Sequence, residues 1–535
     1  MSDLDFSKND SSFTSNLRFL SVLFTGFFLG IIFTKTIGRE ILLMFTTSNL
    51  IPGILLGVIF IGAIISAIVS LKKEGSRDVV LLYVNLFAVG LVFLMFPYIS
   101  DGNDMVLKLS NVLGFGIAFR VNVLTLYMLI IASLLWFIVT LYSHSYISKK
   151  EKSRGRFYFW FMIAYGGAMG AIMADSLITM FLFFEIMYIS CYFLVAHQAT
   201  PEAIKAGYKY IFMGVIGGLS MLLAVIILHV NTGTFDLMTM RQFIVLTNDG
   251  TGRMLLVALV FMLIGFSIKT AIFPLHFWLP GAHSSAPAPA SAILSGLIIK
   301  VYIFSLIKFL FVGLGLEIVE FLRLPDFLPY LASVGMIAGS IFALRQKELK
   351  KMLAYSTVAQ VGYMILGIGL ANPLGVSATL FHVLTHMITK SALFLCAGAM
   401  YYHTGKKNIA DYKGIACKMP VTMGIFTMAA LSMIGIPGLV GFMSKWYLSI
   451  AAIDAGMPYF VIVLLISSFL NAMYYLPIII NAFLIEPEDG QTCFLRDPIP
   501  NNMLLPLVIL GVGLIFFGIF PKVIVAIFQH GITFM

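Results

Sequence analysis

Long apolar segments recur along almost the whole chain, and they constrain its fold more than any other feature. A helix needs about 20 apolar residues to cross the hydrocarbon core of a bilayer. The 535 residues are 60% hydrophobic and only 11% charged, whereas soluble domains contain roughly 25% charged residues. Membrane-spanning strands would alternate apolar and polar residues over about 10 positions, but these runs are continuous. The sequence therefore predicts an all-α polytopic membrane protein.

The apolar segments predict about 14 to 15 transmembrane helices when each segment is matched to the thickness of a bilayer. The first of them follows a polar tail of residues 1–17, which we expect to be exposed. The predicted spans lie near residues 18–36, 50–71, 78–98, 122–145, 157–174, 176–196, 207–229, 254–273, 286–313, 328–345, 352–370, 376–402, 420–450, 457–484 and 503–528.

Basic residues gather in the loops on one predicted side of the membrane, whereas loops such as 101–104 and 231–252 carry few of them. Basic loops usually stay in the cytoplasm, so we expect a multi-pass protein of the inner, cytoplasmic membrane with a cytoplasmic N-terminus. The net charge of +10 then reflects topology, and we predict no nucleic-acid partner. The basic clusters are Lys72–Arg77, Lys149–Arg156, Arg345–Lys351 and Lys406–Lys418.

Two predicted spans are interrupted by proline, which removes a backbone donor and breaks a helix. Pro274 and Pro280 interrupt the first, and Pro437 interrupts the second. Broken backbone at membrane depth persists where it is buried in protein or lines a water-filled cavity. Each break has a lysine beside it, Lys269 in the first and Lys445 in the second. One lysine-bearing break in each half of the chain suggests an internal repeat.

Glu185 lies in the middle of an apolar run, with no other charged residue between Asp175 and Glu202. A carboxylate at that depth costs several kcal/mol and rarely stays without a partner. Lysines within or beside apolar segments offer the opposite charge, and both residue types gain or lose protons when desolvated. The pattern favours charge transfer through the membrane, although a structural ion pair would also explain it. The lysines are Lys269, Lys300, Lys390 and Lys445.

A second group of titratable residues, His382, His386 and Lys390, recurs at every fourth position and so shares one helix face. The His-x-x-x-His spacing also occurs in zinc sites, but no glutamate follows His382 and the sequence offers no third ligand. We therefore favour a proton relay over helix packing or a metal site. The cysteines form no Cys-x-x-Cys pair, so we predict no metal and no cofactor. Secondary candidates for proton handling are Lys209, His276 and His283.

Several motifs together carry a resemblance to a known family. They are Phe184-Glu185, Ser190–Tyr192, Phe273–His283, Ala286–Ala290, Leu349–Ser356, Gly414–Pro420 and Gly435–Tyr447. Through them the chain resembles, over roughly residues 50–530, the antiporter-like membrane subunits shared by Mrp-type cation/proton antiporters, membrane-bound hydrogenases and respiratory complex I. The segment Gly441–Tyr447 is most similar to the D-type Mrp subunit and its hydrogenase relatives.

The resemblance implies two inverted five-helix repeats, with some departures from the family. The apolar segment at 18–36 is an additional span, and Asn122 stands where relatives often have aspartate. No long lateral helix follows the last span, which argues against the largest complex I antiporter-like subunit. The implied regions are the tail at 1–17, N-terminal helices at 18–120, a first repeat at 121–315, a second repeat at 316–485, and a C-terminal loop and last span at 486–535.

The resemblance also implies a proton-translocating membrane subunit of a larger complex, with sodium exchange left open. We hypothesise that Glu185 and Lys269 form an ion pair, whose opening pushes a proton along the series toward Lys445. Matched motif by motif, the implied proton path consists of Glu185, Lys269, Lys300, His382, His386, Lys390 and Lys445.

Two alternative functions remain open at the level of sequence. The chain has no nucleotide-binding loop and no haem motif, so in a redox-driven pump of the hydrogenase or NADH dehydrogenase type the redox centres would lie on other chains. An autonomous transporter of a small solute is also compatible with the broken helices. The partners that we expect are other membrane subunits of an Mrp-type, hydrogenase or complex I-like assembly, protons, sodium as an open case, and the lipid bilayer.

Overall fold

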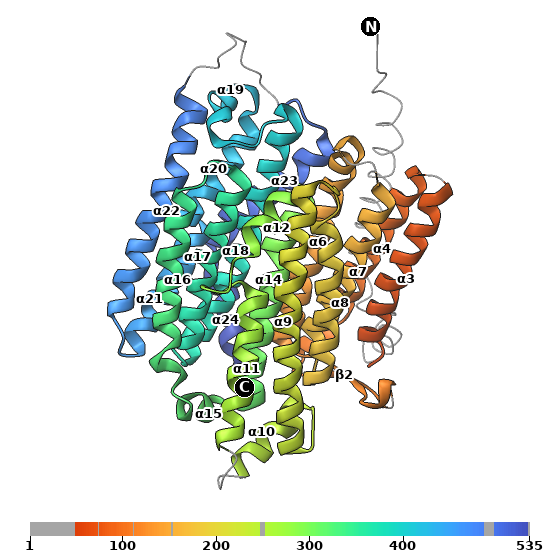
Figure 1. The fold of residues 1–535 in the computed structure, drawn as a ribbon, viewed down its shortest axis with the longest axis vertical. Coiled ribbons are helices and arrows are strands. Elements are labelled where there is room, and N and C mark those ends of the chain that lie inside the picture. Colours follow the sequence, from red (N-terminus) through yellow and green to blue (C-terminus); the bar gives the residue numbers. More distant parts are fainter. Residues whose placement is uncertain are drawn as a thin grey trace.

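The protein forms a bundle of long helices that run roughly in one direction (Figure 1). The computed structural model describes residues 49–72, 74–110, 112–150, 153–246, 252–485 and 497–532. The predicted tail at 1–17 and the predicted additional span at 18–36 lie outside these described residues.

Most of the predicted spans are helices in the structure. Among the described residues, 11 helices are long and apolar enough to cross a membrane, and two further apolar helices, Met254–Thr270 and Pro420–Ile434, are shorter. The predicted span at 157–174 is the helix Arg154–Met173, which is not one of the 11. The prediction of a multi-pass helical membrane protein is therefore confirmed.

The elements follow the chain through the bundle in three groups. The first contains α3 (Ile51–Lys72), α4 (Glu74–Leu94), α5 (Phe96–Ser100), β1 (Met105–Leu109), η1 (Val112–Gly114), β2 (Ile117–Val121), α6 (Val123–Lys150) and α7 (Arg154–Met173). The second contains α8 (Leu177–Val195), α9 (Pro201–Thr232), α10 (Leu237–Leu246), α11 (Gly252–Thr270), α12 (Leu279–Ser285), α13 (Ala288–Ile293), η2 (Leu294–Ile298), α14 (Ile299–Ile307) and η3 (Lys308–Leu314). The third contains α15 (Leu316–Phe321), η4 (Leu324–Asp326), α16 (Leu328–Leu344), α17 (Leu349–Gly369), α18 (Pro373–Thr404), η5 (Ile409–Tyr412), α19 (Ile415–Lys418), α20 (Pro420–Ile434), α21 (Val440–Asp454), α22 (Tyr459–Leu484), α23 (Asn501–Ile519) and α24 (Pro521–Ile532).

Both predicted helix breaks are present. The first separates α11 from α12 across residues 271–278, and the second separates α20 from α21 across residues 435–439. The residues that follow each helix include glycine or proline, which favour turns over helix continuation. Each break leaves its lysine near a helix end, Lys269 in the last turn of α11 and Lys445 in α21.

Two regions differ from the sequence-based expectation. The expected N-terminal region at 18–120 contains the helices α3, α4 and α5, but β1 and β2 add an antiparallel hairpin, which pairs Met105 with Val121 and which the sequence did not predict. The predicted last span at 503–528 is two helices, α23 and α24, which meet at Pro521. Proline disfavours helical backbone in the residue before it, and Phe520 has indeed left the helical conformation, with φ −115° and ψ 53°.

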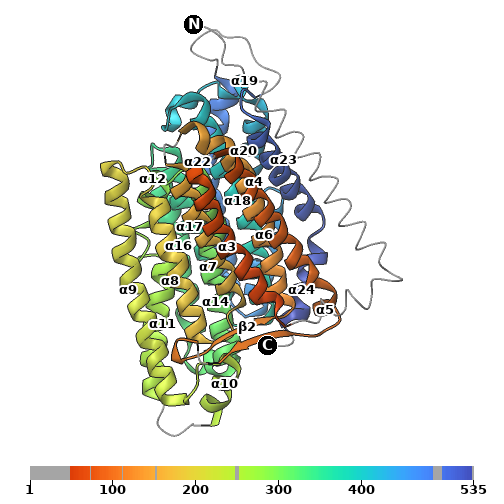
Figure 2. The same cartoon turned by 90° about the vertical axis from the view of Figure 1, so that its right-hand side faces the viewer.

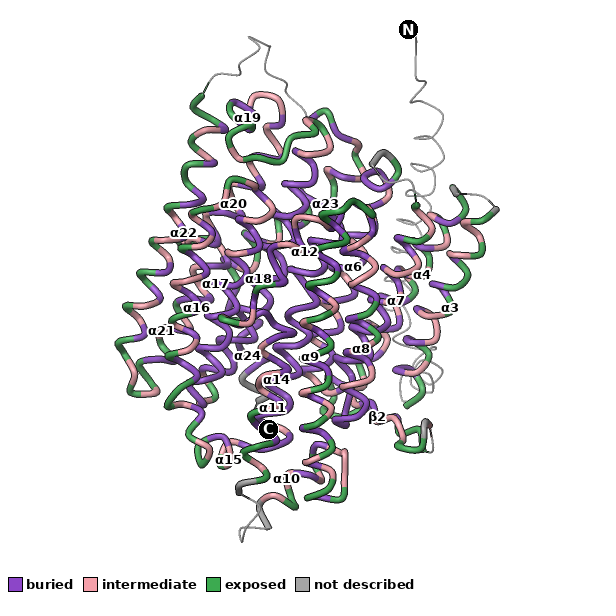
Figure 3. Tube along the Cα trace, in the orientation of Figure 1, coloured by how far each residue is buried: buried purple, intermediate pink, exposed green. Residues whose placement is uncertain are grey.

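The centre of the bundle is the helix α18. It is 32 residues long, and its most apolar stretch is completely buried. It packs against α17, α20, α21, α13 and α23. Figure 3 shows buried residues gathered around α18 and exposed residues along outer helices such as α22 and α3. A titratable residue in the buried stretch of α18 is therefore shielded from lipid by the surrounding helices.

The two ends of the bundle differ in charge. The basic loops around residues 345–351 and 406–418 meet at one end, where Glu348 bridges to Asn408 and the Leu349 amide donates to the Lys407 carbonyl over 3.1 Å. Figures 1 and 2 place α19 at this end and β2 and α10 at the other. The second end carries charges of both signs. Asp104 and Asp175 bind Arg120 there, and Asp236 binds Lys108.

Candidate functional site

An ion pair between Glu185 on α8 and Lys269 on α11 forms one end of the candidate site. The Lys269 Nζ lies 2.8 Å from the Glu185 Oε1. The same ammonium lies 3.7 Å from the centre of the Tyr188 ring, a cation–π distance. The Lys269 side chain is fully buried, whereas the Glu185 side chain is 26% exposed. The pair expected from the sequence is present, and its acidic member is the one that reaches the surface.

Glycines of α9 make room for this pair, a feature that sequence reasoning missed. A Cβ at Gly218 would lie 2.7 Å from the Glu185 Oε1, and a Cβ at Gly214 would lie 1.6 Å from the Tyr188 Cζ. Tyr188 also stacks on Tyr210 of α9, with ring centres 4.3 Å apart. A Cβ at Gly214 would overlap the Tyr188 ring, and a Cβ at Gly218 would force the Glu185 carboxylate to move.

The first helix break lies directly after this pair. One carbonyl at the end of α11 is bound by a side chain: the Trp278 Nε1 donates to the Ile268 carbonyl over 2.8 Å. His276 is buried within the break and packs against Phe273, with ring centres 5.4 Å apart. No described residue forms a hydrogen bond with the His276 Nδ1. His276 thus packs inside the break, and its Nδ1 stays without a hydrogen bond to any described residue.

Lys300 is the next lysine, and it is completely buried. It lies in the first turn of α14, between the π-helical segments η2 and η3. Its Nζ donates to the Ser295 carbonyl in η2, and the Ser295 hydroxyl in turn meets the Thr357 hydroxyl of α17 at 2.8 Å. A π-helical turn interrupts the regular pattern of helix hydrogen bonds and often marks a functional position. Here the π-helical segment η2 presents the Ser295 carbonyl to the Lys300 ammonium.

The titratable group on α18 is buried along its whole length. The His382 Nδ1 lies 2.9 Å from the Ser444 hydroxyl of α21, and the rings of His382 and His386 are 6.2 Å apart. Neither ring nitrogen of His386 has a hydrogen-bond partner among the described residues. The Lys390 Nζ donates to the Leu353 carbonyl over 3.0 Å and to the Ser356 hydroxyl of α17. The group forms a line of titratable side chains within the buried core, beside buried hydroxyls such as those of Ser356 and Ser444.

Lys445 closes the series at the second helix break. Its Nζ donates to the carbonyls of Met433 and Ile434, each at 2.8 Å, and to the Ser468 hydroxyl at 2.8 Å. The two carbonyls belong to the last turn of α20, where helix carbonyls lack partners and carry partial negative charge. Gly435 makes the turn beside them with φ +99°, a conformation suited to glycine.

The secondary candidates divide between the core and the surface. His283 is completely buried in α12, and both of its ring nitrogens lack a hydrogen-bond partner within the described part of the chain. Lys209 is exposed on α9, on the outer surface of the bundle, so the structure does not bring it to the series.

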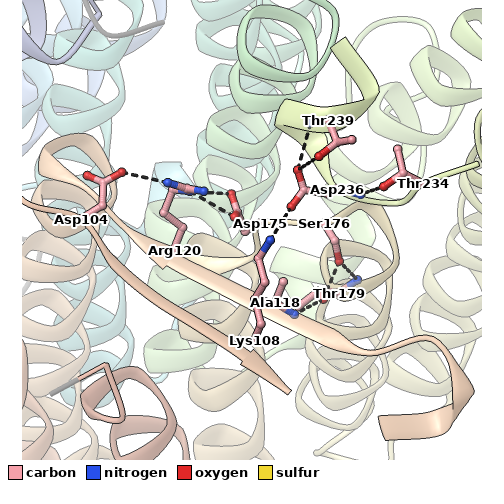
Figure 4. Close-up of polar contacts among 10 residues, drawn as sticks. All are labelled: Asp104, Lys108, Ala118, Arg120, Asp175, Ser176, Thr179, Thr234, Asp236 and Thr239. Atoms are coloured by element: carbon pink, nitrogen blue, oxygen red, sulfur yellow. Dashed lines mark hydrogen bonds and ion pairs between the residues drawn. The ribbon is translucent and has the colours of Figure 1, made fainter. Parts of the chain in front are cut away.

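Sequence reasoning missed a further cluster at the hairpin end. Asp175, in the turn between α7 and α8, is buried and bound by Arg120 (Figure 4). Lys308 of η3 is also buried and donates to the Ala174 carbonyl next to Asp175. Asn122 caps α6 by accepting a hydrogen bond from the Thr125 amide over 2.9 Å. These contacts could not be predicted from the sequence, because most of them join residues that are far apart in the chain.

Metal-ligand clusters do not occur in the part of the chain that the structure describes, since no three His, Cys, Asp or Glu residues are grouped there. The groups that the described site offers for chemistry are its own carboxylate, ammonium and imidazole groups. These are the groups that carry protons in proteins.

Comparison with protein families gives a match that covers more than half of the chain. The family described as "NADH:quinone oxidoreductase/Mrp antiporter, TM" matches residues 174–471. NADH-quinone oxidoreductase subunit N of Desulforudis audaxviator is 36% identical over 71% of this chain and 77% of its own length. A Na(+)/H(+) antiporter subunit of the D type from Alkalihalophilus pseudofirmus is 30% identical over 65% of this chain and 69% of its own length.

Solved structures share the fold. A chain of the archaeal membrane-bound sulfane sulfur reductase superposes with a TM-score of 0.83 at 24% identity, over 91% of this chain and 97% of that chain. A chain of the Mrp complex from Dietzia sp. DQ12-45-1b gives a TM-score of 0.80 at 22% identity, over 90% of this chain and 96% of that chain. At these identities the likeness establishes the architecture.

Proposed function

The chain belongs to the NADH:quinone oxidoreductase/Mrp antiporter transmembrane family, and we propose that it translocates protons as one membrane subunit of a larger complex. Its relatives are named as subunits of NADH-quinone oxidoreductases and of a sodium/proton antiporter. The observation that carries the proposal is a line of buried titratable groups across the bundle, within a core that is otherwise largely apolar. Burying several ionisable groups in a membrane costs free energy, and a role in proton transfer explains why the chain contains them.

The proposed proton path runs from the Glu185–Lys269 pair through Lys300 to the titratable group on α18 and on to Lys445. Two contacts support its order: Lys269 meets Glu185, and His382 meets Ser444, the residue next to Lys445. Between them, His386 is close enough to both Lys300 and Lys390 to interact electrostatically. Opening the Glu185–Lys269 pair leaves the ammonium of Lys269 without its counter-ion, which favours passing its proton on. His276 and His283 take the role of secondary proton carriers.

We further propose the orientation and the regional organisation that the sequence predicts. The basic end of the bundle faces the cytoplasm, by the preference of basic loops for that side, in the inner membrane of the cell. The two inverted repeats cover residues 121–315 and 316–485, and each contains one of the helix breaks. Whether the chain also exchanges sodium for protons is left open in this proposal.

A redox-driven pump is the second candidate for the host complex. The relative named as subunit N of an NADH-quinone oxidoreductase favours it, and it requires redox centres on other chains. Mass spectrometry of the chains that purify with this protein in mild detergent separates the two. Small membrane subunits alone indicate a cation/proton antiporter, whereas iron–sulfur, nickel or flavin subunits indicate a redox-driven pump.

The proposed function predicts that the Glu185→Gln variant assembles into its complex but transports protons slowly. The neutral amide cannot hold the charge of Lys269 or accept its proton, and loss of a proton-transfer group slows transfer by about a hundredfold. Proton uptake into sealed vesicles, followed with a pH-sensitive dye, measures the effect. The matched control is Glu202→Gln, which changes an exposed glutamate on α9. Transport at the normal rate in Glu185→Gln would contradict the proposed path.

A further inference from the structure

A water-accessible cavity opens at the hairpin end of the bundle, away from the basic loops. Its volume is about 240 Å³, enough for several water molecules, since a water occupies about 30 Å³ in the liquid. Residues from the loop before β1, from β2, α6, α10, α14 and η3 and from the turn between α7 and α8 line it. Four of them are charged, two acids and two bases: Asp104, Arg120, Asp175 and Lys308.

The hairpin fixes Asp175 in this cavity wall. The Asp175 amide donates to the Ala118 carbonyl of β2 over 2.9 Å, and the Asp175 carbonyl accepts from the Leu237 amide over 3.3 Å. The Ala118 amide in turn donates to the Thr179 hydroxyl of α8 over 3.0 Å (Figure 4). With its backbone held on both sides, Asp175 has little freedom to move its carboxylate.

Arg120 neutralises this carboxylate. Its Nε lies 3.1 Å from both oxygens of Asp175, and its Nη1 lies 3.0 Å from Asp104 (Figure 4). Partial burial acts to lower the pKa of Arg120, but its two acidic partners outweigh this effect and raise the pKa above the ordinary value. Arginine does not release a proton under physiological conditions. Arg120 and Asp175 therefore form a fixed ion pair, and Lys308 is the remaining basic group of the cavity wall.

Lys308 connects this wall to the buried series. It lies in the same continuous helical segment as Lys300, eight residues further on, which corresponds to about 12 Å along the helix axis. Its Nζ donates to the Ile172 carbonyl over 3.3 Å and to the Ala174 carbonyl, both at the end of α7. Ser305 lies between the two lysines in the sequence; it is completely buried, and its hydroxyl has no partner among the described residues.

We propose that Lys308 exchanges protons between the buried series and the water of this cavity, on the face opposite the basic loops. The proposal rests on the proposed function. In one step the Lys308 ammonium gives its proton to a cavity water, which leaves a neutral amine and a hydronium ion. The amine then takes a proton from the side of Lys300, which regenerates the ammonium and completes the cycle. The carbonyls at the end of α7 hold the ammonium in place between transfers.

A purely structural role for Lys308, tying η3 to the end of α7, is the competing interpretation. The Lys308→Arg variant separates the two, because arginine keeps the positive charge but does not release a proton. We expect Lys308→Arg and Lys308→Met each to slow proton uptake into vesicles by about a hundredfold, as for other lost proton-transfer groups. The matched control is Lys108→Met, which removes an exposed lysine of β1 at the same end of the bundle and should transport normally.

The outcomes distinguish this inference from the proposed function. If Lys308→Arg transports like the wild-type protein while Glu185→Gln is blocked, Lys308 is structural and the inference fails, but the proposed function stands. If Glu185→Gln also transports normally, both fail.

A cysteine at this position provides a test that is independent of how well arginine fits. We expect Lys308→Cys to transport slowly and to recover when a thiosulfonate reagent attaches an ethylammonium group, which restores a titratable amine. A neutral methyl thiosulfonate should give no recovery. In sealed vesicles of known orientation, recovery should follow addition at the hairpin side. Recovery only from the basic side, or no recovery, would overturn the proposal. The unsubstituted chain, whose Cys191 and Cys396 are buried, is treated in parallel.

Discussion

At the scale of single residues, the ion pair of Glu185 and Lys269 depends on a residue that carries no charge. Gly218 of α9 faces the Glu185 carboxylate, and a methyl group there would lie 2.7 Å from the Oε1. The carboxylate would have to move, and its contact with the Lys269 ammonium, now 2.8 Å, would lengthen. The strength of the pair is thus set by packing as well as by charge.

Gly218→Ala is therefore expected to slow proton transport without removing any titratable group. Displacement of Glu185 weakens the pair that starts the proposed proton path, and we expect a loss smaller than the roughly hundredfold effect of removing a proton-transfer group. Vesicle proton uptake measures it. The control is Gly424→Ala in α20, where an added Cβ meets nothing within 4 Å. An unchanged rate in Gly218→Ala would show that the pair tolerates displacement.

At the scale of elements, the lysine of the second break has a structural role as well as the proposed transport role. Lys445 binds two carbonyls at the end of α20 and the Ser468 hydroxyl of α22. It therefore joins three helices at the point where the backbone ladder stops. Unpaired carbonyls buried away from water destabilise a fold.

Lys445→Met should consequently lower both stability and proton transport. Loss of the hydrogen bonds to Met433 and Ile434 costs about 1–3 kcal/mol if the carbonyls stay unpaired. Thermal unfolding of the purified complex would show a lower midpoint than the wild type, whereas Lys413→Met, at an exposed lysine near α19, would leave the midpoint unchanged. A Lys445→Met complex of full stability would mean that water replaces the ammonium.

The elements also show what sequence can predict. The spans and both breaks were predictable, because a bilayer demands long apolar runs and proline marks interruptions. The β1–β2 hairpin was missed because its five-residue strands are short beside the apolar helices around them. Gly218 and Lys308 were missed because their importance comes from contacts with α8 and with the end of α7. Such contacts join residues far apart in the sequence.

At the scale of the whole molecule, the basic loops around residues 345–351 and 406–418 lie together at one end of the bundle. At the basic end, His197 lies between α8 and α9 and is buried, and the Arg156 guanidinium donates to its carbonyl over 2.8 Å. Burial lowers the pKa of His197 from 6.5 to about 4, and the charge of Arg156 adds to this effect. The folded protein thus keeps this imidazole neutral where an unfolded chain would protonate it.

This difference predicts a pH-dependent stability. Between pH 6.5 and about 4 the unfolded chain binds a proton that the folded chain does not, so stability falls as the pH falls through this window. Below it both states are protonated and the contribution is constant. Thermal midpoints measured across this range should fall less steeply in His197→Gln than in the wild type, while the exposed His403, changed to Gln, should leave the slope intact. Equal slopes in all three proteins would contradict the burial argument.

The central claim is that protons cross the membrane through the buried series of this chain, and Lys300→Met tests it most directly. Lys300 is completely buried between the two halves of the path, and methionine fills its volume without carrying a proton. The purified complex is reconstituted into vesicles, its subunit composition is checked, and proton uptake is compared with that of Lys205→Met, an exposed lysine of α9. We predict that Lys300→Met keeps all subunits but loses most proton transport, while Lys205→Met transports normally. Normal transport in a fully assembled Lys300→Met complex would contradict the claim.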